Sequence, residues 1–181
     1  MERFADGHRR WTVHGERTIY DHRWVRLGKA DITTPSGARF EHHTLHLPSA
    51  VVIAIVDQAE NKVLMGHRHR FVPDTWGWEL PGGIVDPGEQ PEEAVVREAL
   101  EETGYRVGSL EHVVTFEPMI GMMHSPHHVY IGHDATLACE PTETDEGSYE
   151  WVPLSEARTL VNEGQVQSSG SLVALMRLFA A

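Results

Sequence analysis

The run from Ala50 to Val56 constrains the fold more than any other feature of this chain. It holds seven apolar residues in unbroken succession. A strand with one face in water would carry a polar side chain at every second position, so a continuous apolar run indicates a strand covered on both faces. The run is far too short to cross a bilayer as a helix. It therefore predicts a buried central strand, with residues 61–65 as its hairpin partner.

The rest of the chain predicts a mixed sheet with few helices. Strands are expected at 18–20, 24–27, 30–32, 40–47, 111–117, 128–138 and 148–152, and helices at 91–103, 154–162 and 169–180. We predict an α/β (α+β) fold in which helices sandwich a mixed central sheet. Residues 1–48 are expected to form an N-terminal antiparallel ribbon, and residues 49–181 the main domain.

The composition opposes several classes of function. Fifteen Lys and Arg against 27 Asp and Glu give a formal net charge of −12, which disfavours nucleic acid and anionic membranes as partners. Cys139 is the only cysteine, so neither an intrachain disulfide nor a cysteine-based zinc site is expected. The first twenty residues lack the apolar core of a signal peptide. We therefore predict a cytoplasmic protein without nucleic acid or membrane partners.

Residues 91–103 form the most strongly helical pattern in the middle of the chain. Pro91 suits the first turn, where its missing N–H is harmless, and Gly104 suits a left-handed cap at the end. An apolar arc that can pack on a sheet is formed by Val95, Val96, Ala99, Leu100 and Thr103.

Three carboxylates share a second arc of this helix. Glu98, Glu101 and Glu102 are spaced by three and four residues and return to one side. At about 6 Å and an effective dielectric near 20, each pair of charges costs roughly 3 kcal/mol. A divalent cation such as Mg²⁺, which prefers oxygen ligands, removes that repulsion. Taken alone, the cluster is more typical of a solvated acidic face, and only the surrounding pattern favours a metal site.

That pattern resembles the Nudix box. Counting from Gly83, five residues precede Glu89 and seven more precede Arg97-Glu98, after which the stretch closes with Glu101-Glu102, one residue and Gly104. Every fixed polar and glycine position of the box is matched, and Ala99 and Tyr105 occupy its two apolar positions. The resemblance implies a Nudix-type α/β/α sandwich and a hydrolase that holds Mg²⁺, or Mn²⁺, against a diphosphate.

The resemblance also implies which residues bind the metal. Glu98 and Glu102 would be the principal ligands, with Glu101 beside them and the region of Gly83 contributing a backbone carbonyl. The metal would neutralise the phosphates and lower the pKa of a water that attacks phosphorus.

Other box residues are given supporting roles by the same resemblance. Arg97 would orient the carboxylates by pairing with Glu89, and Arg97 and Glu101 are assigned to the catalytic machinery. Glu89 and Gly104 are expected to be structural.

A general base outside the box is expected on the acidic segment 143–150. Glu146 resembles the loop glutamate that precedes a Glu-Trp strand in some Nudix enzymes, so it is the first choice. Glu143 and Asp145 are the reserves. The alternative for this segment is a solvated turn.

Two segments upstream of the box resemble the ADP-ribose pyrophosphatase branch of the family. His67-Arg68-His69-Arg70-Phe71 is similar to its Gln-Tyr-Arg segment, which places Arg70 at a substrate phosphate, with Arg68 beside it. A planar guanidinium suits bidentate contact with phosphate. A surface cation is the alternative for Arg70.

The second segment, 76–83, is similar to the branch's Glu-Leu-Pro-Ala-Gly, with Gly82 in place of alanine. The resemblance implies that Glu79 and Trp78 contact the substrate, the tryptophan by stacking on a base. Trp76 is the alternative for stacking, and a core position is the alternative for either ring.

The N-terminal ribbon resembles the extra sheet through which that branch dimerises, so a homodimer is expected. The loop 119–126 departs from the branch, because it is rich in methionine where an acidic residue often stands. Met122 is therefore expected to line the pocket, beside a less polar or bulkier group on the second phosphate.

The leading hypothesis is hydrolysis of a nucleoside diphosphate linked to another group, with a nucleotide sugar or ADP-ribose, cleaved to AMP and ribose 5-phosphate, as the default. A nucleoside triphosphate pyrophosphohydrolase and a diphosphate hydrolase of a specialised pathway are the enzymatic alternatives. Isoprenoid diphosphate isomerisation is disfavoured because it needs a cysteine in the pocket. A non-catalytic nucleotide sensor is disfavoured because sensors of this family usually lose box carboxylates.

Overall fold

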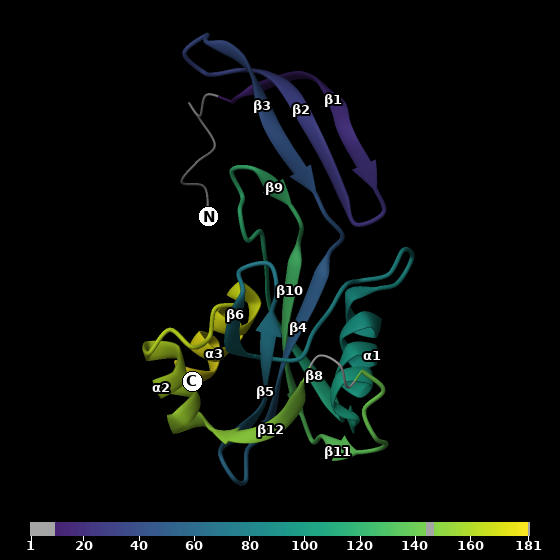
Figure 1. The fold of residues 1–181 in the computed structure, drawn as a ribbon, viewed down its shortest axis with the longest axis vertical. Coiled ribbons are helices and arrows are strands. Elements are labelled where there is room, and N and C mark those ends of the chain that lie inside the picture. Colours follow the sequence, from purple (N-terminus) through teal and green to yellow (C-terminus); the bar gives the residue numbers. More distant parts are fainter. Residues whose placement is uncertain (1–9, 144–146, 181) are drawn as a thin grey trace. The chain divides into compact units, whose positions relative to one another are not determined.

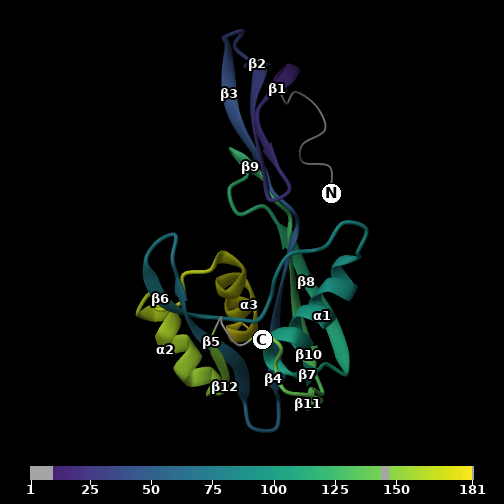
Figure 2. The ribbon, with the colours of Figure 1, turned by 45° about the vertical axis from the view of Figure 1, so that its right-hand side comes forward.

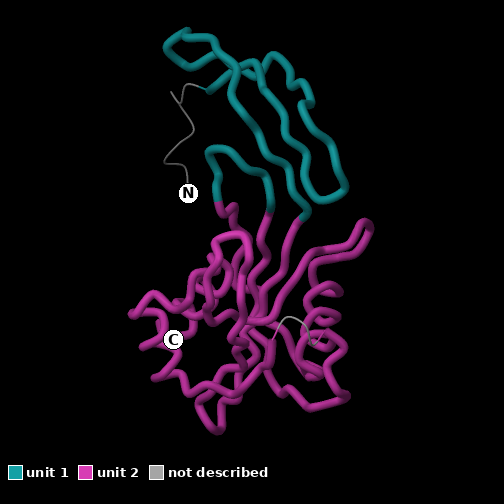
Figure 3. Tube along the Cα trace, in the orientation of Figure 1, with its two compact units in different colours: residues 1–48, 119–125 teal, residues 49–118, 126–181 magenta. Residues whose placement is uncertain are grey.

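The chain divides into two compact units. The computed structural model describes residues 10–143 and 147–180. Unit 1 comprises Met1–Pro48 and Met119–Ser125, and unit 2 comprises Ser49–Pro118 and Pro126–Ala181 (Figure 3). The methionine-rich segment thus belongs to the same unit as the N-terminal strands.

Unit 1 is a four-stranded sheet. Strands β1 (Thr12–His22), β2 (Val25–Thr33) and β3 (Arg39–His46) pair antiparallel in that order, and β9 (Met123–His124) adds to β3 in parallel. Two separate strands were expected at 24–27 and 30–32, but they form the single strand β2. Pairing with β1 on one side and β3 on the other carries β2 through Gly28, which has a weak intrinsic preference for strands.

The main sheet of unit 2 has six strands. Its order is β12-β5-β4-β10-β8, with β6 paired to β5, and β4 and β10 run parallel while the other pairs are antiparallel. The strands are β4 (Ala50–Asp57), β5 (Lys62–Arg70), β6 (Thr75–Glu79), β8 (Ser109–Phe116), β10 (His127–His133) and β12 (Ser148–Pro153). The predicted mixed sheet is confirmed.

Helices cover both faces of this sheet. Helix α1 (Pro91–Thr103) lies on one face, and α2 (Leu154–Asn162) and α3 (Ser169–Phe179) lie on the other (Figures 1 and 2). Along β4, Ile53 and Ile55 pack into the cluster with α1, whereas Ala54 and Val56 pack into the cluster with α2 and α3. Burying each of the larger side chains stabilises the fold by about 1.5–3 kcal/mol. Burial on both faces is why this run carries no polar residue.

Three local features differ from the prediction. The strand expected at 128–138 breaks at Asp134, whose φ is +55°, and residues Thr136–Leu137 form β11, which pairs with β7 (Tyr105–Arg106). Val96 is 37% exposed rather than packed on the sheet. Strands β6, β7 and β9 (Met123–His124) were not predicted, because β7 and β9 are two residues long and Gly77 weakens the five-residue β6.

No helix among the described residues is long and apolar enough to cross a membrane.

Candidate active site

Helix α1 has well-defined ends that fix the position of the box carboxylates. It begins at Pro91, and the Gln90 N–H donates to the Glu93 carboxylate at 3.1 Å. It ends where Gly104 takes a φ of +73° and donates its N–H to the Leu100 carbonyl at 2.9 Å. Both ends and the left-handed cap agree with the sequence prediction.

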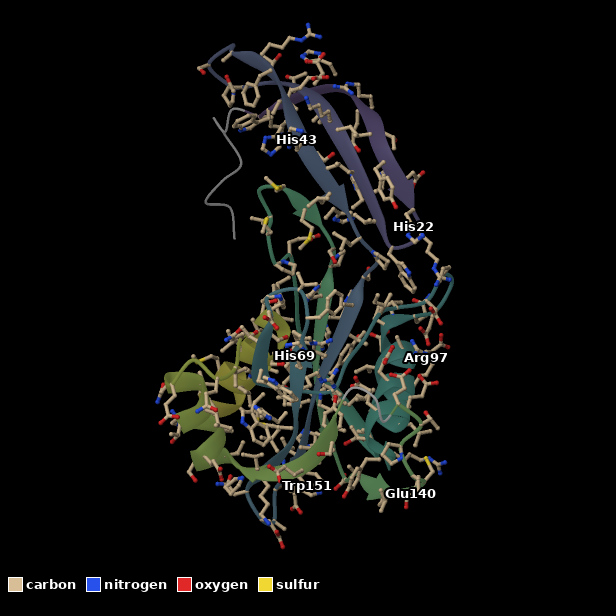
Figure 4. All side chains as sticks on the ribbon, viewed as in Figure 1. His22, His43, His69, Arg97, Glu140 and Trp151 are labelled. Carbon is tan, nitrogen blue, oxygen red and sulfur yellow. The ribbon has the colours of Figure 1, made fainter. Side chains whose placement is uncertain are left out.

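Arg97 lies on α1 (Figure 4), and its hydrogen bonds connect the helix to the loop that precedes it. Its Nε and Nη2 donate to the two oxygens of Glu89 at 2.9 and 3.0 Å, and its Nη1 donates to Glu98 at 2.8 Å and Glu101 at 3.0 Å. Nη2 also reaches the Ile84 carbonyl at 3.0 Å. The Arg97 guanidinium lowers the pKa of Glu89. The pairing expected between Arg97 and Glu89 is therefore present.

Glu98 lies against the glycine loop. Only 7% of the residue is exposed, and burial raises the pKa of its carboxyl, although Arg97 opposes that effect. A Cβ on Gly83 would collide with the Glu98 carboxylate, so only glycine at position 83 lets this carboxylate reach the backbone. The structure thus brings the Glu98 carboxylate against the loop predicted to supply a metal ligand.

Glu102 is the most enclosed carboxylate of the box. It is 3% exposed, and its Oε1 accepts from Arg68 Nη2 at 3.0 Å. Its Oε2 accepts from the Tyr149 hydroxyl and from the Gly82 N–H, each at 2.8 Å. Arg68 also donates to the Tyr149 hydroxyl. Glu98 and Glu102 are buried on α1, whereas the Glu101 side chain is 38% exposed.

Tyr149 was not identified from the sequence as a site residue. It pairs with Gly66 across β5 and β12, and a Cβ on Gly66 would press against the Tyr149 ring. A tyrosine opposite a glycine in neighbouring strands is the signal that could have indicated it, but the register that brings the two together is set by the fold.

A cavity of about 850 Å³ lies at the β5–β6 hairpin. Arg68, Arg70 and Glu79 line it, and Arg70 pairs with Glu79 through Nε at 3.0 Å and Nη2 at 2.7 Å. Trp76 also lines the cavity and is 63% exposed. Trp78 instead packs against the core cluster under α2 and α3. The geometry favours Trp76 over Trp78 as the ring that a ligand in this cavity meets.

Four predicted residues remain, and the structure describes two of them. Glu146 and Asp145 fall outside the described residues. Glu143 donates its N–H to the Glu101 carbonyl at 3.2 Å, which places its backbone at the end of α1. Met122 belongs to unit 1, where its carbonyl accepts from the Leu45 N–H at 2.9 Å.

The donor set fits a hard divalent cation. Glu98 and Glu102 offer carboxylate oxygens on successive turns, and the absence of a side chain on Gly83 lets the Glu98 carboxylate lie against the loop backbone. Across residues 10–143 and 147–180, no three His, Cys, Asp or Glu side chains form a ready-made metal cluster. Glu101 turns toward Arg97, and Glu102 is held by Arg68 and its neighbours.

Comparisons with known proteins identify the class. A family model described as the NUDIX domain matches residues 46–174. The chain is 44% identical over 168 residues to a CMP-5′-(N-acetyl-N-hydroxy-3-aminopropyl)phosphonate hydrolase of Streptomyces rubellomurinus, covering 92% of this chain and 81% of that protein. It is 28% identical over 164 residues to the ADP-ribose pyrophosphatase of Bacillus subtilis, covering 88% of each.

The fold agrees with this class. A crystal structure of an ADP compounds hydrolase matches with a TM-score of 0.81 at 18% identity, covering 94% of this chain and 92% of that one. The chain belongs to the Nudix hydrolase family. It is an enzyme that hydrolyses phosphoanhydride bonds, in a family that generally uses divalent metals, and it resembles the ADP-ribose pyrophosphatase branch.

Proposed function

We propose that this enzyme hydrolyses the anhydride bridge between a nucleoside 5′-monophosphate and a second phosphorus group. The observation that carries the proposal is that Arg68 belongs to two sites at once. It lines the cavity of about 850 Å³, and it bonds Glu102 of the box helix at 3.0 Å. A substrate in the cavity therefore lies beside the box carboxylates.

The first candidate substrate is a CMP-linked phosphonate, and ADP-ribose is the second. The first rests on the 44% identity to the phosphonate hydrolase of Streptomyces rubellomurinus. The second rests on the 28% identity to the pyrophosphatase of Bacillus subtilis. In either case water adds across the P–O–P bridge. One phosphorus keeps the bridging oxygen and the other gains the oxygen of water, so that a nucleoside monophosphate leaves.

We propose Mg²⁺, replaceable by Mn²⁺, as the cofactor. Glu98 and Glu102 would hold it, with Glu101 and the Gly83 carbonyl as further ligands. When bound there, a divalent cation supplies charge neutralisation for the phosphates and activation of water.

The chain's own groups take the other roles. Arg70 presents a planar guanidinium to a phosphate, and Trp76 presents an exposed ring to a base. Glu146 is proposed to accept the proton of the attacking water. The described residues on either side support this, since Glu143 lies at the end of α1 and Gly147 lines the cavity.

We also propose that the enzyme is a homodimer whose two chains associate through unit 1. Every residue of β1 is exposed, and the unit displays large apolar side chains to solvent, among them Trp11, Val13, Ile19, Tyr20 and Phe40. An exposed apolar set of this kind marks interaction surfaces. Light scattering after gel filtration should give twice the mass of one chain, and a monomer would contradict the proposal.

The substrate test is a panel incubated with Mg²⁺ and resolved by chromatography. It holds a CMP-linked phosphonate, ADP-ribose, a nucleotide sugar and ATP, each with an EDTA control. Preferential release of CMP from the first is expected, and water labelled with ¹⁸O identifies the attacked phosphorus. Preference for ATP with release of pyrophosphate would support the triphosphate alternative and contradict the proposal.

A further inference from the structure

Arg68 occupies an unusual place for a cation beside a metal site. It comes from β5, yet its guanidinium and the Glu102 carboxylate are both only 3% exposed. Removing one partner of such a buried pair leaves an uncompensated charge, so the two groups hold each other in the metal-free protein.

The lone pairs of Glu102 are largely engaged by the protein itself. A carboxylate offers about four acceptor sites. Arg68, the Tyr149 hydroxyl and the Gly82 N–H already donate to it. A divalent cation that binds through Glu102 therefore competes with these donors for the carboxylate oxygens. Tyr149 and Gly82 are neutral dipoles, whereas Arg68 carries a charge that repels the cation.

The cavity offers the Arg68 guanidinium a second position, away from Glu102. Arg68 lines the same cavity as Arg70, and exposed apolar and aromatic side chains, among them Phe71, Val72 and Trp76, line other parts of that cavity. An anion in the cavity can accept the guanidinium when it leaves Glu102, because arginine pairs with phosphate as readily as with carboxylate.

We propose that Arg68 is a positioning residue that moves between Glu102 and the substrate's phosphate. In the metal-free protein it neutralises Glu102 and competes with the cation. Once the cation is bound, Arg68 turns to the phosphate in the cavity. Metal and nucleotide binding then favour each other through one side chain, and by thermodynamic linkage the effect is reciprocal. This inference rests on the metal site of the proposed function.

The test measures binding rather than turnover. Free Mn²⁺ is titrated by electron paramagnetic resonance, and CMP binding is measured by calorimetry, in the wild type and in Arg68→Gln. The variant should bind Mn²⁺ about tenfold more tightly and CMP about tenfold more weakly. A merely structural role would weaken both, so equal or weaker Mn²⁺ binding by a folded Arg68→Gln protein would overturn the inference.

Two control variants separate the loss of the Arg68 charge from the loss of any positive charge and from the loss of the arginine side chain. Arg177→Gln removes the same charge from an exposed pair with Glu111, 3.7 Å apart, and should leave Mn²⁺ affinity unchanged. Arg68→Lys keeps the cation, so its Mn²⁺ affinity should stay near that of the wild type. An affinity as high as that expected of the glutamine variant would contradict the competition.

A second measurement needs no neutral variant and covers the case in which Arg68→Gln does not fold. The ¹⁵N side-chain resonances of arginine are followed as Mg²⁺ is added to the wild type, with the Arg68 signal assigned by its loss in Arg68→Lys. The signal should shift on Mg²⁺ addition and again with CMP, and a constant signal would overturn the inference. A wild type that binds neither Mn²⁺ nor Mg²⁺ would overturn the proposed metal site as well, whereas normal Mn²⁺ binding unaffected by Arg68→Gln would overturn only this inference.

Discussion

Two arginines contact the carboxylates of α1, and their surroundings differ. Arg97 belongs to the helix, keeps 30% of its side chain exposed and divides its donors among Glu89, Glu98 and Glu101. Arg68 comes from β5, is 3% exposed and meets Glu102. An ion pair in contact with water is screened and contributes little to stability, whereas a buried one cannot lose a partner without a large penalty.

The difference in exposure indicates that the two arginines have different roles. Arg97 can exchange partners at low cost, which suits a residue that orients several carboxylates. Arg68 stays paired with Glu102 until another cation neutralises that carboxylate. We therefore expect changes on the Arg68 side to alter both stability and metal binding, and changes on the Arg97 side to have small effects on stability.

The largest effect is expected for Glu102→Gln. Loss of a principal metal ligand should reduce kcat/KM by about a thousandfold or more, the equivalent of several kcal/mol of charge stabilisation. The variant also leaves Arg68 without its buried counter-ion, so the free energy of unfolding should fall by about 3 kcal/mol. Steady-state kinetics and urea unfolding in EDTA measure the two losses.

A paired variant sharpens this prediction. Replacing both charges, in Arg68→Met with Glu102→Leu, should recover most of the lost stability without recovering activity, because an apolar pair needs no counter-ion. If the double variant is less stable than Glu102→Gln, the buried pair is not the cause of the instability.

The next largest effect is expected for Gly83→Ala. The new Cβ would collide with the Glu98 carboxylate and push it from the loop. Activity and Mn²⁺ affinity should fall by about a hundredfold, in the upper range seen when a metal ligand is displaced or misdirected. Gly15→Ala is the matched control, since nothing lies within 4 Å of a Cβ there. Equal effects of the two substitutions would contradict the role of the glycine loop.

Most of the fold could be predicted because its signals are local. The run 50–56 indicated a strand buried on both faces, and the start and end residues of α1 follow from Pro91 and Gly104. The break at Asp134 was missed because apolar residues resume at Ala135 and Leu137, although Gly132 and Asp134 are typical of a turn.

The contacts of the site also divide into local ones, which the sequence indicates, and long-range ones, which it does not. Arg97 pairs with Glu101 four residues further along its own helix, so spacing along the sequence indicates that contact. Arg68 and Glu102 are 34 residues apart, and Tyr149 is 47 from Glu102. Such contacts depend on how β5 and β12 pass α1, and residue spacing carries no information about that geometry.

A smaller effect is expected for Tyr149→Phe. The variant removes one neutral donor to Glu102 and one acceptor of Arg68, and leaves the ion pair between Arg68 and Glu102 in place. Stability should fall by about 1 kcal/mol, and Mn²⁺ affinity by about tenfold. Tyr105→Phe is the control, because that hydroxyl accepts from Trp151 Nε1 at 3.0 Å and contacts no box carboxylate in the described part of the chain. A Mn²⁺ affinity that falls equally in both variants would show that general loosening is responsible.

The smallest effect is expected at Glu89, on the Arg97 side. Arg97 holds the pKa of Glu89 below its ordinary value of 4.5. A lowered folded-state pKa means that the carboxylate stabilises the protein above pH 4.5 and that this contribution is lost as the pH falls through the folded value. In EDTA, Glu89→Gln should be less stable than the wild type by about 1 kcal/mol or less at pH 7. The two unfolding curves should converge as the pH is lowered below 4.5. A stability difference that persists unchanged at low pH would mean that the Glu89 side chain acts through packing. In that case the orientation of the box by Arg97 would not depend on the negative charge of Glu89.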